Sequence, residues 1–377
     1  MKTGVERRWE PSETNQASIQ LRFTEENWHR VETAWTAWWQ GELDRPLVMI
    51  EGMELPPGMG DFDIFDVGVP TTHFPLDQSA GEVLDYYQVR LEAKRFYGDA
   101  WPKWWPKFGP GVAAAFLGAS VQVAQDTAWF GAVEGANSHN LDLTFDPDNA
   151  WWKRVLELTC LATERWGPSV SVGHTDLGGN LDILASLLTT ERLLFDLSDE
   201  PEQVARLARS LTQAWLRYYE DLYALIEPAG RGTTSWAAVW SPARSYMLQS
   251  DFAYMISPRM FERFVLPDLA ACCDALDHAF YHLDGKGQIC HLDMLLSLER
   301  LRGIQWIPGD GQPPPEAWLP VLKRIREAGK LCQLYVSPEG ALTISRELGG
   351  RGFALFIDRP MGRAEAEGFL QEIQRQE

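Results

Sequence analysis

Large apolar residues near the start of the chain recur at helical spacing. They lie three or four positions apart: Trp28, Val31, Trp35, Trp38 and Trp39. This spacing places them on one face of an α-helix. Thr24 followed by two glutamates is typical of a helix N-cap and its first turn, and Gly41 marks the expected end. The pattern therefore predicts a helix between Thr24 and Gly41 with one tryptophan-rich face.

Strand-like apolar runs alternate with amphipathic stretches over most of the remaining chain. Short strands are expected at residues 47–50 and in the stretch that leads to residues 108–111. Further strands are predicted at residues 169–173, 233–239, 280–283, 303–307, 331–336 and 353–357. Helices are predicted at residues 190–197, 202–224, 258–277, 294–300, 317–328 and 342–348. About eight strands alternating with helices predict an α/β fold, a single (β/α)8 TIM barrel with an N-terminal helical extension.

One barrel accounts for the 377 residues without a second domain. Residues 1–45 are expected to form a polar arm and a helix packed on the barrel, and residues 46–377 to form the barrel itself. No internal repeat or low-complexity segment divides the sequence.

The chain is acidic, with 34 lysines and arginines against 53 aspartates and glutamates, for a formal net charge of −19. Binding to nucleic acid needs a concentrated basic face, and no run of lysine or arginine occurs. No apolar run approaches the roughly 18 residues of a membrane span, and the first residues lack a signal-peptide pattern. The five cysteines form no CxxC pair. We therefore expect a cytoplasmic protein that binds neither nucleic acid nor membrane.

His282 and Asp284 are the first candidates for chemistry. The active site of a TIM barrel lies at the carboxyl ends of its strands, and these two residues end a predicted strand. Their i, i+2 spacing places both side chains on one face. A histidine with a carboxylate can bind Zn²⁺ or another divalent ion, or act as a general base with its acid partner. The alternative is structural: Asp284 caps the next helix and His282 is a core histidine.

His174 and Asp176 repeat this spacing at the end of another predicted strand and form a second candidate catalytic pair. Asp176 precedes two glycines, so it is equally suited to a turn. Gln249, Asp251 and Asp310 follow other strand-like runs on the expected catalytic face and are candidates for substrate binding. A lone carboxylate in a turn is otherwise simply solvated.

Two of the 17 tryptophans are candidates for a pocket wall. Trp240 and Trp306 each lie at a predicted strand end, and an indole face attracts protonated or quaternary amines. Most of the other tryptophans are expected to pack in the core.

Several strings resemble the uroporphyrinogen decarboxylase superfamily, which includes the decarboxylase and the methyltransferases that serve corrinoid proteins. They lie at residues 105–111, 178–187, 191–197, 199–204, 256–267 and 282–285. The resemblance covers roughly residues 100 to 360 and implies a TIM barrel. Barrels of this family often pair, so it also implies a homodimer.

The resemblance favours methyl transfer over decarboxylation of a porphyrinogen. The decarboxylase has an amino-terminal Arg-Gln-Ala-Gly-Arg segment, which is missing here, and the charge of −19 would repel a polyanionic tetrapyrrole. The zinc methyltransferases of the superfamily use a His-x-Cys pair and a later cysteine. The matching position here is His282-Leu-Asp284, which leaves open a harder His/Asp metal site or no metal.

We therefore expect an enzyme that moves a methyl group between a small methylated substrate and a corrinoid protein or thiol. The implied cofactors are zinc or another divalent metal, held by His282 and Asp284, and methylcobalamin on a partner protein. Two alternatives remain. One is a metal-independent decarboxylase or lyase that acts on a small carboxylated substrate. The other is a barrel that binds a small molecule without catalysis.

Overall fold

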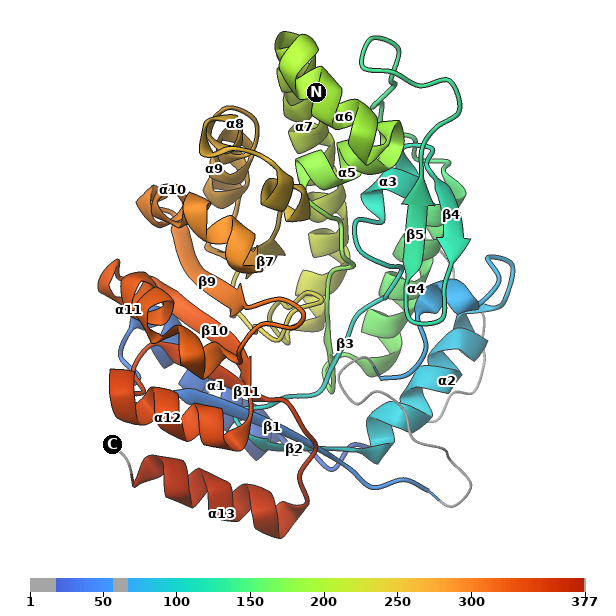
Figure 1. Ribbon diagram of the computed structural model, residues 1–377. Coiled ribbons are helices and arrows are strands. Elements are labelled where there is room, and N and C mark those ends of the chain that lie inside the picture. Colours follow the sequence, from blue (N-terminus) through green and yellow to red (C-terminus); the bar gives the residue numbers. More distant parts are fainter. Residues whose placement is uncertain (1–17, 57–66, 376–377) are drawn as a thin grey trace, which may run out of the picture.

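The computed structural model describes residues 18–56 and 67–375 (Figure 1). The first helix, α1 (Glu25–Gln40), confirms the prediction from the apolar stripe. The Thr24 hydroxyl accepts the Asn27 backbone N–H, and the Asn27 side chain accepts the Thr24 N–H, which forms a reciprocal cap. Gly41 ends the helix at φ 70°, a conformation that glycine adopts without strain.

The central sheet has seven strands in the order β2-β1-β11-β10-β9-β8-β7. Their bounds are β1 Leu47–Met53, β2 Lys94–Gly98, β7 Ser245–Leu248, β8 His278–Asp284, β9 Leu301–Ile307, β10 Leu331–Val336 and β11 Phe353–Ile357. All neighbours are parallel except β1 and β2. An α/β fold with a mostly parallel sheet is therefore confirmed.

Four short strands lie outside this sheet. β3 (Lys103–Trp104) pairs in parallel with β6 (Ser171–Val172), and β4 (Ser120–Val123) forms an antiparallel hairpin with β5 (Ala128–Gly131). The backbone of β6 continues toward the next segment, because the His174 N–H donates to Thr234 O at 3.0 Å. Within the described residues these ladders do not close into a ring. The closed (β/α)8 barrel is thus not confirmed.

The strand predicted at residues 233–239 is wrong. Thr233 makes one antiparallel bridge to Ser241, and the Val239 N–H donates to Ala237 O at 2.9 Å. A bond over two residues makes a tight turn, which prevents an extended strand. β7, which the sequence pattern did not predict, pairs with β8 instead.

Helices surround the strands. Their bounds are α2 Ala80–Ala93, α3 Ala113–Phe116, α4 Ala150–Trp166, α5 Asn180–Leu188, α6 Thr190–Asp199, α7 Pro201–Ile226, α8 Pro258–Phe264, α9 Leu266–Ala275, α10 Leu292–Ser297, α11 Leu319–Glu327, α12 Pro338–Leu348 and α13 Arg363–Gln374. The single helix predicted at residues 258–277 divides into α8 and α9, because Pro267 has no N–H to continue the ladder. None of the helices in the described part is long and apolar enough to cross a membrane.

Apolar side chains form two cores on opposite sides of the strands. Along β1, Leu47 and Met49 belong to one core, whereas Val48 and Ile50 belong to the other. We call the first the tryptophan core. It joins the buried face of α1 to strand residues and contains Trp28, Trp35, Trp38, Trp39, Trp101, Trp240, Met247, Phe280 and Phe356. α1 covers the amino end of β8, because the Trp39 ring stacks on His278 at 4.1 Å between centroids.

Candidate functional site

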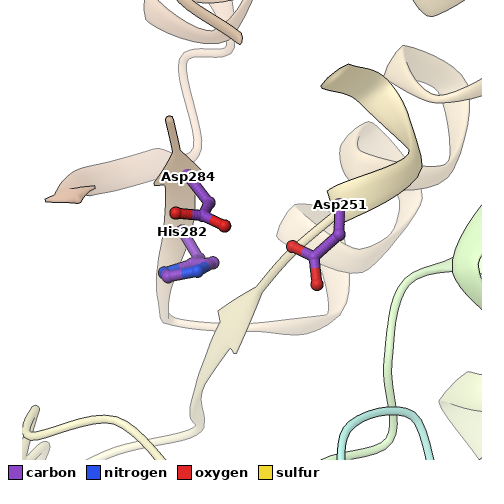
Figure 2. Close-up of side chains that lie close together, drawn as sticks. All are labelled: Asp251, His282 and Asp284. Atoms are coloured by element: carbon purple, nitrogen blue, oxygen red, sulfur yellow. The ribbon is translucent and has the colours of Figure 1, made fainter. Parts of the chain in front are cut away.

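Three side chains come together at the carboxyl end of β8. Asp251 begins the 3₁₀ helix η3 (Asp251–Met255), which follows β7, while His282 and Asp284 end β8. One ligand atom from each residue lies within 4.8 Å of the others. Figure 2 shows Asp251 facing the two β8 side chains from the neighbouring segment. We call these three residues the Asp-His-Asp cluster. Because β7 and β8 are parallel neighbours, their carboxyl ends lie at the same edge of the sheet.

Asp182, in the first turn of α5, holds the backbone beside Asp251. Its carboxylate accepts the Asp251 N–H at 3.1 Å and the Phe252 N–H at 2.7 Å. The chains approach closely here, since a Cβ on Gly179 would lie 2.2 Å from Gln249 O. The glycine and the carboxylate together fix the start of η3, and with it the position of Asp251.

Crowded acids give the site an unusual charge balance. Asp251 reaches solvent, but partial removal of its carboxyl group from water raises its pKa to about 6, and the Asp284 charge adds to this rise. Burial raises the pKa of Asp182 to about 7, with Asp251 as the next cause. Burial also lowers the pKa of His282, against the attraction of Asp284. A neutral imidazole beside crowded carboxylates favours the uptake of a cation or of protons.

The cluster fits a divalent cation by donor type and by spacing. Ligand atoms about 2.1 Å from one ion lie at most about 4.2 Å apart, so small side-chain rotations would bring all three onto it. One imidazole and two carboxylates are a harder donor set than thiolates and suit Zn²⁺, Mn²⁺ or Fe²⁺. The same groups are suited to general acid–base chemistry.

A cavity of about 490 Å³ opens beside Asp284. Its wall includes Asp310, Gln312 and Tyr335 together with the proline run at residues 313–315. Asp310 thus shares a cavity with Asp284 of the cluster, although Asp310 itself is exposed to solvent. The cavity is large enough for a small substrate.

The structure does not bring His174 to the cluster. Its ring is fully buried and stacks on Tyr219 at 4.5 Å between centroids, and its Nδ1 lies 3.4 Å from Thr234 O. Burial lowers the pKa of His174 to about 4, so the ring is neutral. Asp176 accepts the Gly178 N–H at 3.0 Å, as expected for a turn residue. Burial raises the pKa of Asp176 to about 8, and the charge of Asp251 is the next cause.

Neither candidate tryptophan lies in the cluster. Trp240 belongs to the tryptophan core, where its Nε1 donates to Arg231 O at 2.8 Å. Trp306 pairs with Leu283 across β8 and β9, so it lies on the face opposite His282 and packs on Trp318 at 5.3 Å between centroids. Gln249 is buried, and its Oε1 has no hydrogen-bond partner among the described residues.

Four residues around the cluster were not predicted from the sequence. Asp182 anchors η3, Gln305 contacts His282 Nδ1, Gln333 contacts Gln305, and the Trp236 ring meets the His282 ring edge-on at 5.1 Å. The signal for both glutamines was present, because each is a polar residue inside an apolar strand. Only the strand register, however, places them behind His282.

Comparison with known proteins shows a similarity of fold. No family model matches the sequence, and none of the curated proteins matches it. The fold is similar to solved structures, among them a methyltransferase from Methanosarcina mazei, with a TM-score of 0.60 and 14% sequence identity. The similarity covers 92% of this chain and 98% of that methyltransferase. The two proteins therefore share a fold over nearly their whole length.

Proposed function

We propose that this chain is a methyltransferase of the uroporphyrinogen decarboxylase-like superfamily. It moves a methyl group between a small methylated substrate and a corrinoid protein or a thiol. The Asp-His-Asp cluster carries the proposal. It contains His282 and Asp284, which stand at the position where these methyltransferases have their His-x-Cys zinc-binding pair. The shared fold with the Methanosarcina mazei methyltransferase supports the same reaction class.

The proposal includes a closed (β/α)8 barrel. β3 and β6 are parallel, and β6 is linked onward by the bond from His174 N–H to Thr234 O. These short parallel pairings lie between β1 and β7 along the chain. A closed barrel would place the cluster at its catalytic face.

Each residue of the site has a separate task in this proposal. Asp251, His282 and Asp284 hold a divalent metal such as zinc, and Asp182 fixes the backbone that carries Asp251. When bound, such an ion polarises its ligands as a Lewis acid and stabilises an acceptor thiol as thiolate. Asp310 borders the cavity in which a small substrate would lie next to Asp284.

The test combines elemental analysis with an assay of methyl transfer. Purified full-length protein should contain about one equivalent of a divalent metal. It should transfer methyl from methylcobalamin to a thiol, or from a small methylated substrate to a reduced corrinoid. His282→Ala and Asp284→Asn should each reduce turnover at least about 100-fold. Asp293→Asn, an exposed aspartate paired with Arg324, is the matched control and should leave turnover unchanged. A protein without metal and without turnover on any thiol or corrinoid would contradict the proposal.

Asp176 favours one second candidate, a metal-independent decarboxylase or lyase. With a pKa of about 8, its buried carboxyl group is protonated at neutral pH and is able to donate a proton. CO₂ release from a small carboxylated substrate that persists in chelator and is lost in Asp176→Asn would favour this reaction. If no variant of the cluster changes any turnover or ligand affinity, a binding protein without catalysis is favoured instead.

A further inference from the structure

Two buried glutamines lie beside His282, on the next two strands of the sheet. Gln305 in β9 and Gln333 in β10 have no exposed surface. In the strand register His282 pairs with Gln305, and Gln305 pairs with Gln333. Three polar side chains thus lie side by side across three adjacent parallel strands. Amide groups buried in a core need hydrogen-bond partners, and here Gln305 bonds both to the Gln333 amide and to the imidazole.

The hydrogen bonds of this row determine which amide atom of Gln305 faces each neighbour. Gln305 Nε2 donates to Gln333 Oε1, so Gln305 turns its own Oε1 toward His282 Nδ1. A carbonyl oxygen only accepts, and therefore Nδ1 carries the proton. The other ring nitrogen, Nε2, then keeps its lone pair.

We propose that Gln305 and Gln333 are positioning residues that fix His282 as the Nδ1–H tautomer. Nε2 is then the nitrogen available to a divalent cation or to a substrate proton. Histidines that bind a metal generally donate their other ring N–H to a fixed acceptor, which sets both the tautomer and the ring orientation. The role in metal binding rests on the proposed function, whereas the tautomer itself does not.

The reverse arrangement is the competing outcome. In the observed row, Gln333 Nε2 has no partner among the described residues. If both amides were turned end over end, Gln305 Nε2 would donate to His282 Nδ1, and the proton would lie on Nε2. The two arrangements differ in one proton position, which nitrogen NMR distinguishes.

The first test measures that proton in metal-free, full-length protein labelled with ¹⁵N-histidine. At pH 8, above the usual imidazole pKa, long-range ¹H–¹⁵N correlation should show His282 with a protonated Nδ1 and a bare Nε2. The His282→Ala spectrum identifies the signals among the seven histidines. Protonation at Nε2 in the unmutated protein would overturn the proposal, and this result needs no variant of either glutamine to fold.

The variants then test whether the glutamines impose the tautomer. Gln305→Leu removes the acceptor and should give mixed tautomers, whereas Gln305→Glu keeps an acceptor and should retain Nδ1–H. Gln333→Leu should give an intermediate effect, because it frees Gln305 to rotate. Gln288→Leu is the control, since this buried glutamine contacts Tyr281 and Ser250 but not His282. A Gln305→Leu spectrum that matches the unmutated protein would overturn the positioning role.

The second readout is the affinity for Zn²⁺ alone, measured by calorimetry. Gln305→Leu should bind Zn²⁺ about 10–100-fold more weakly, and Gln305→Glu should stay within a few-fold of the unmutated protein. Equal affinities in all three proteins would contradict a role in metal binding. If the unmutated protein binds no Zn²⁺ and transfers no methyl group, the proposed function fails while the tautomer result still stands.

Discussion

The two ends of β8 differ in almost every physical property. At the amino end, His278 stacks on Trp39 and Phe280 stacks on Trp38, at 4.1 and 6.0 Å between ring centroids. At the carboxyl end, His282 and Asp284 face the carboxylate of Asp251. Burial of aromatic surface stabilises the fold, whereas burial of charge costs free energy unless a partner compensates it. The amino end of β8 thus stabilises the fold, whereas its carboxyl end carries a polar site that costs stability.

The largest expected effect is at the tryptophan end. Trp38→Ala should lower the free energy of unfolding by about 3–5 kcal/mol, because it leaves a cavity between α1 and β8. Denaturant unfolding measures this change. Trp129, which is 61% exposed, is the matched control, and its replacement by alanine should stay within about 0.5 kcal/mol. A loss below about 1 kcal/mol in Trp38→Ala would contradict the stabilising role of the tryptophan core.

The second expected effect is a change in the free energy of unfolding between pH 5 and pH 7. Burial raises the pKa of Asp268 to about 7, so the folded chain keeps a proton that the unfolded chain releases near pH 4. The folded state binds more protons in this range, and stability therefore falls as the pH rises toward 7. The loss between pH 5 and pH 7 should be on the order of 2 kcal/mol.

Asp268→Asn should remove this part of the slope when urea unfolding is followed from pH 5 to pH 8. Asp293→Asn, at an exposed aspartate, should keep the slope of the unmutated protein. An identical slope in Asp268→Asn and the unmutated protein would show that Asp268 is not the group that titrates.

The third prediction returns to α1. Thr24→Ala removes the hydroxyl that accepts the Asn27 N–H, which is half of the reciprocal cap, and should lower the free energy of unfolding by about 1 kcal/mol. Thr24→Ser, which keeps the hydroxyl, should recover most of the loss. Thermal unfolding curves measure both variants, and an unchanged midpoint in Thr24→Ala would argue that packing alone holds the helix.

The smallest effect has the opposite sign. Asp251→Asn removes one of the crowded carboxylates and should raise the free energy of unfolding at pH 8 by roughly 0.5 kcal/mol, a small gain because Asp251 reaches solvent. The same variant should bind Zn²⁺ far more weakly. A gain in stability together with a loss of binding would sharpen the contrast between the two ends of β8. A variant that is less stable at pH 8 would contradict it.

Sequence patterns predicted the elements whose signals are local. β10 and β11 have the predicted bounds, and α1 follows from its cap, its apolar stripe and Gly41. The i, i+2 rule also placed His282 and Asp284 on one face. Most of the rest depends on which strands are neighbours, information that no local pattern carries. Trp306 is one example, because its face is set by the pairing of β8 with β9.

In the candidate site, too, local patterns predicted some residues, and only the pairing of strands brings in the others. Asp251 was a candidate from its place after a strand-like run, yet its position close to His282 depends on the pairing of β7 with β8. Trp240 lies in the tryptophan core, away from the cluster, because the segment predicted as a strand before it forms a turn. Gln305 acquires its role only through the register with His282.

The most direct test of the central claim is anomalous X-ray diffraction from crystals grown with Co²⁺ or Zn²⁺. The account predicts one strong peak between Asp251, His282 and Asp284, about 2.0–2.2 Å from a carboxylate oxygen of each aspartate and from Nε2 of the histidine. The absence of a peak at the Asp-His-Asp cluster at saturating metal would contradict this prediction. So would a metal ion bound elsewhere in the chain instead.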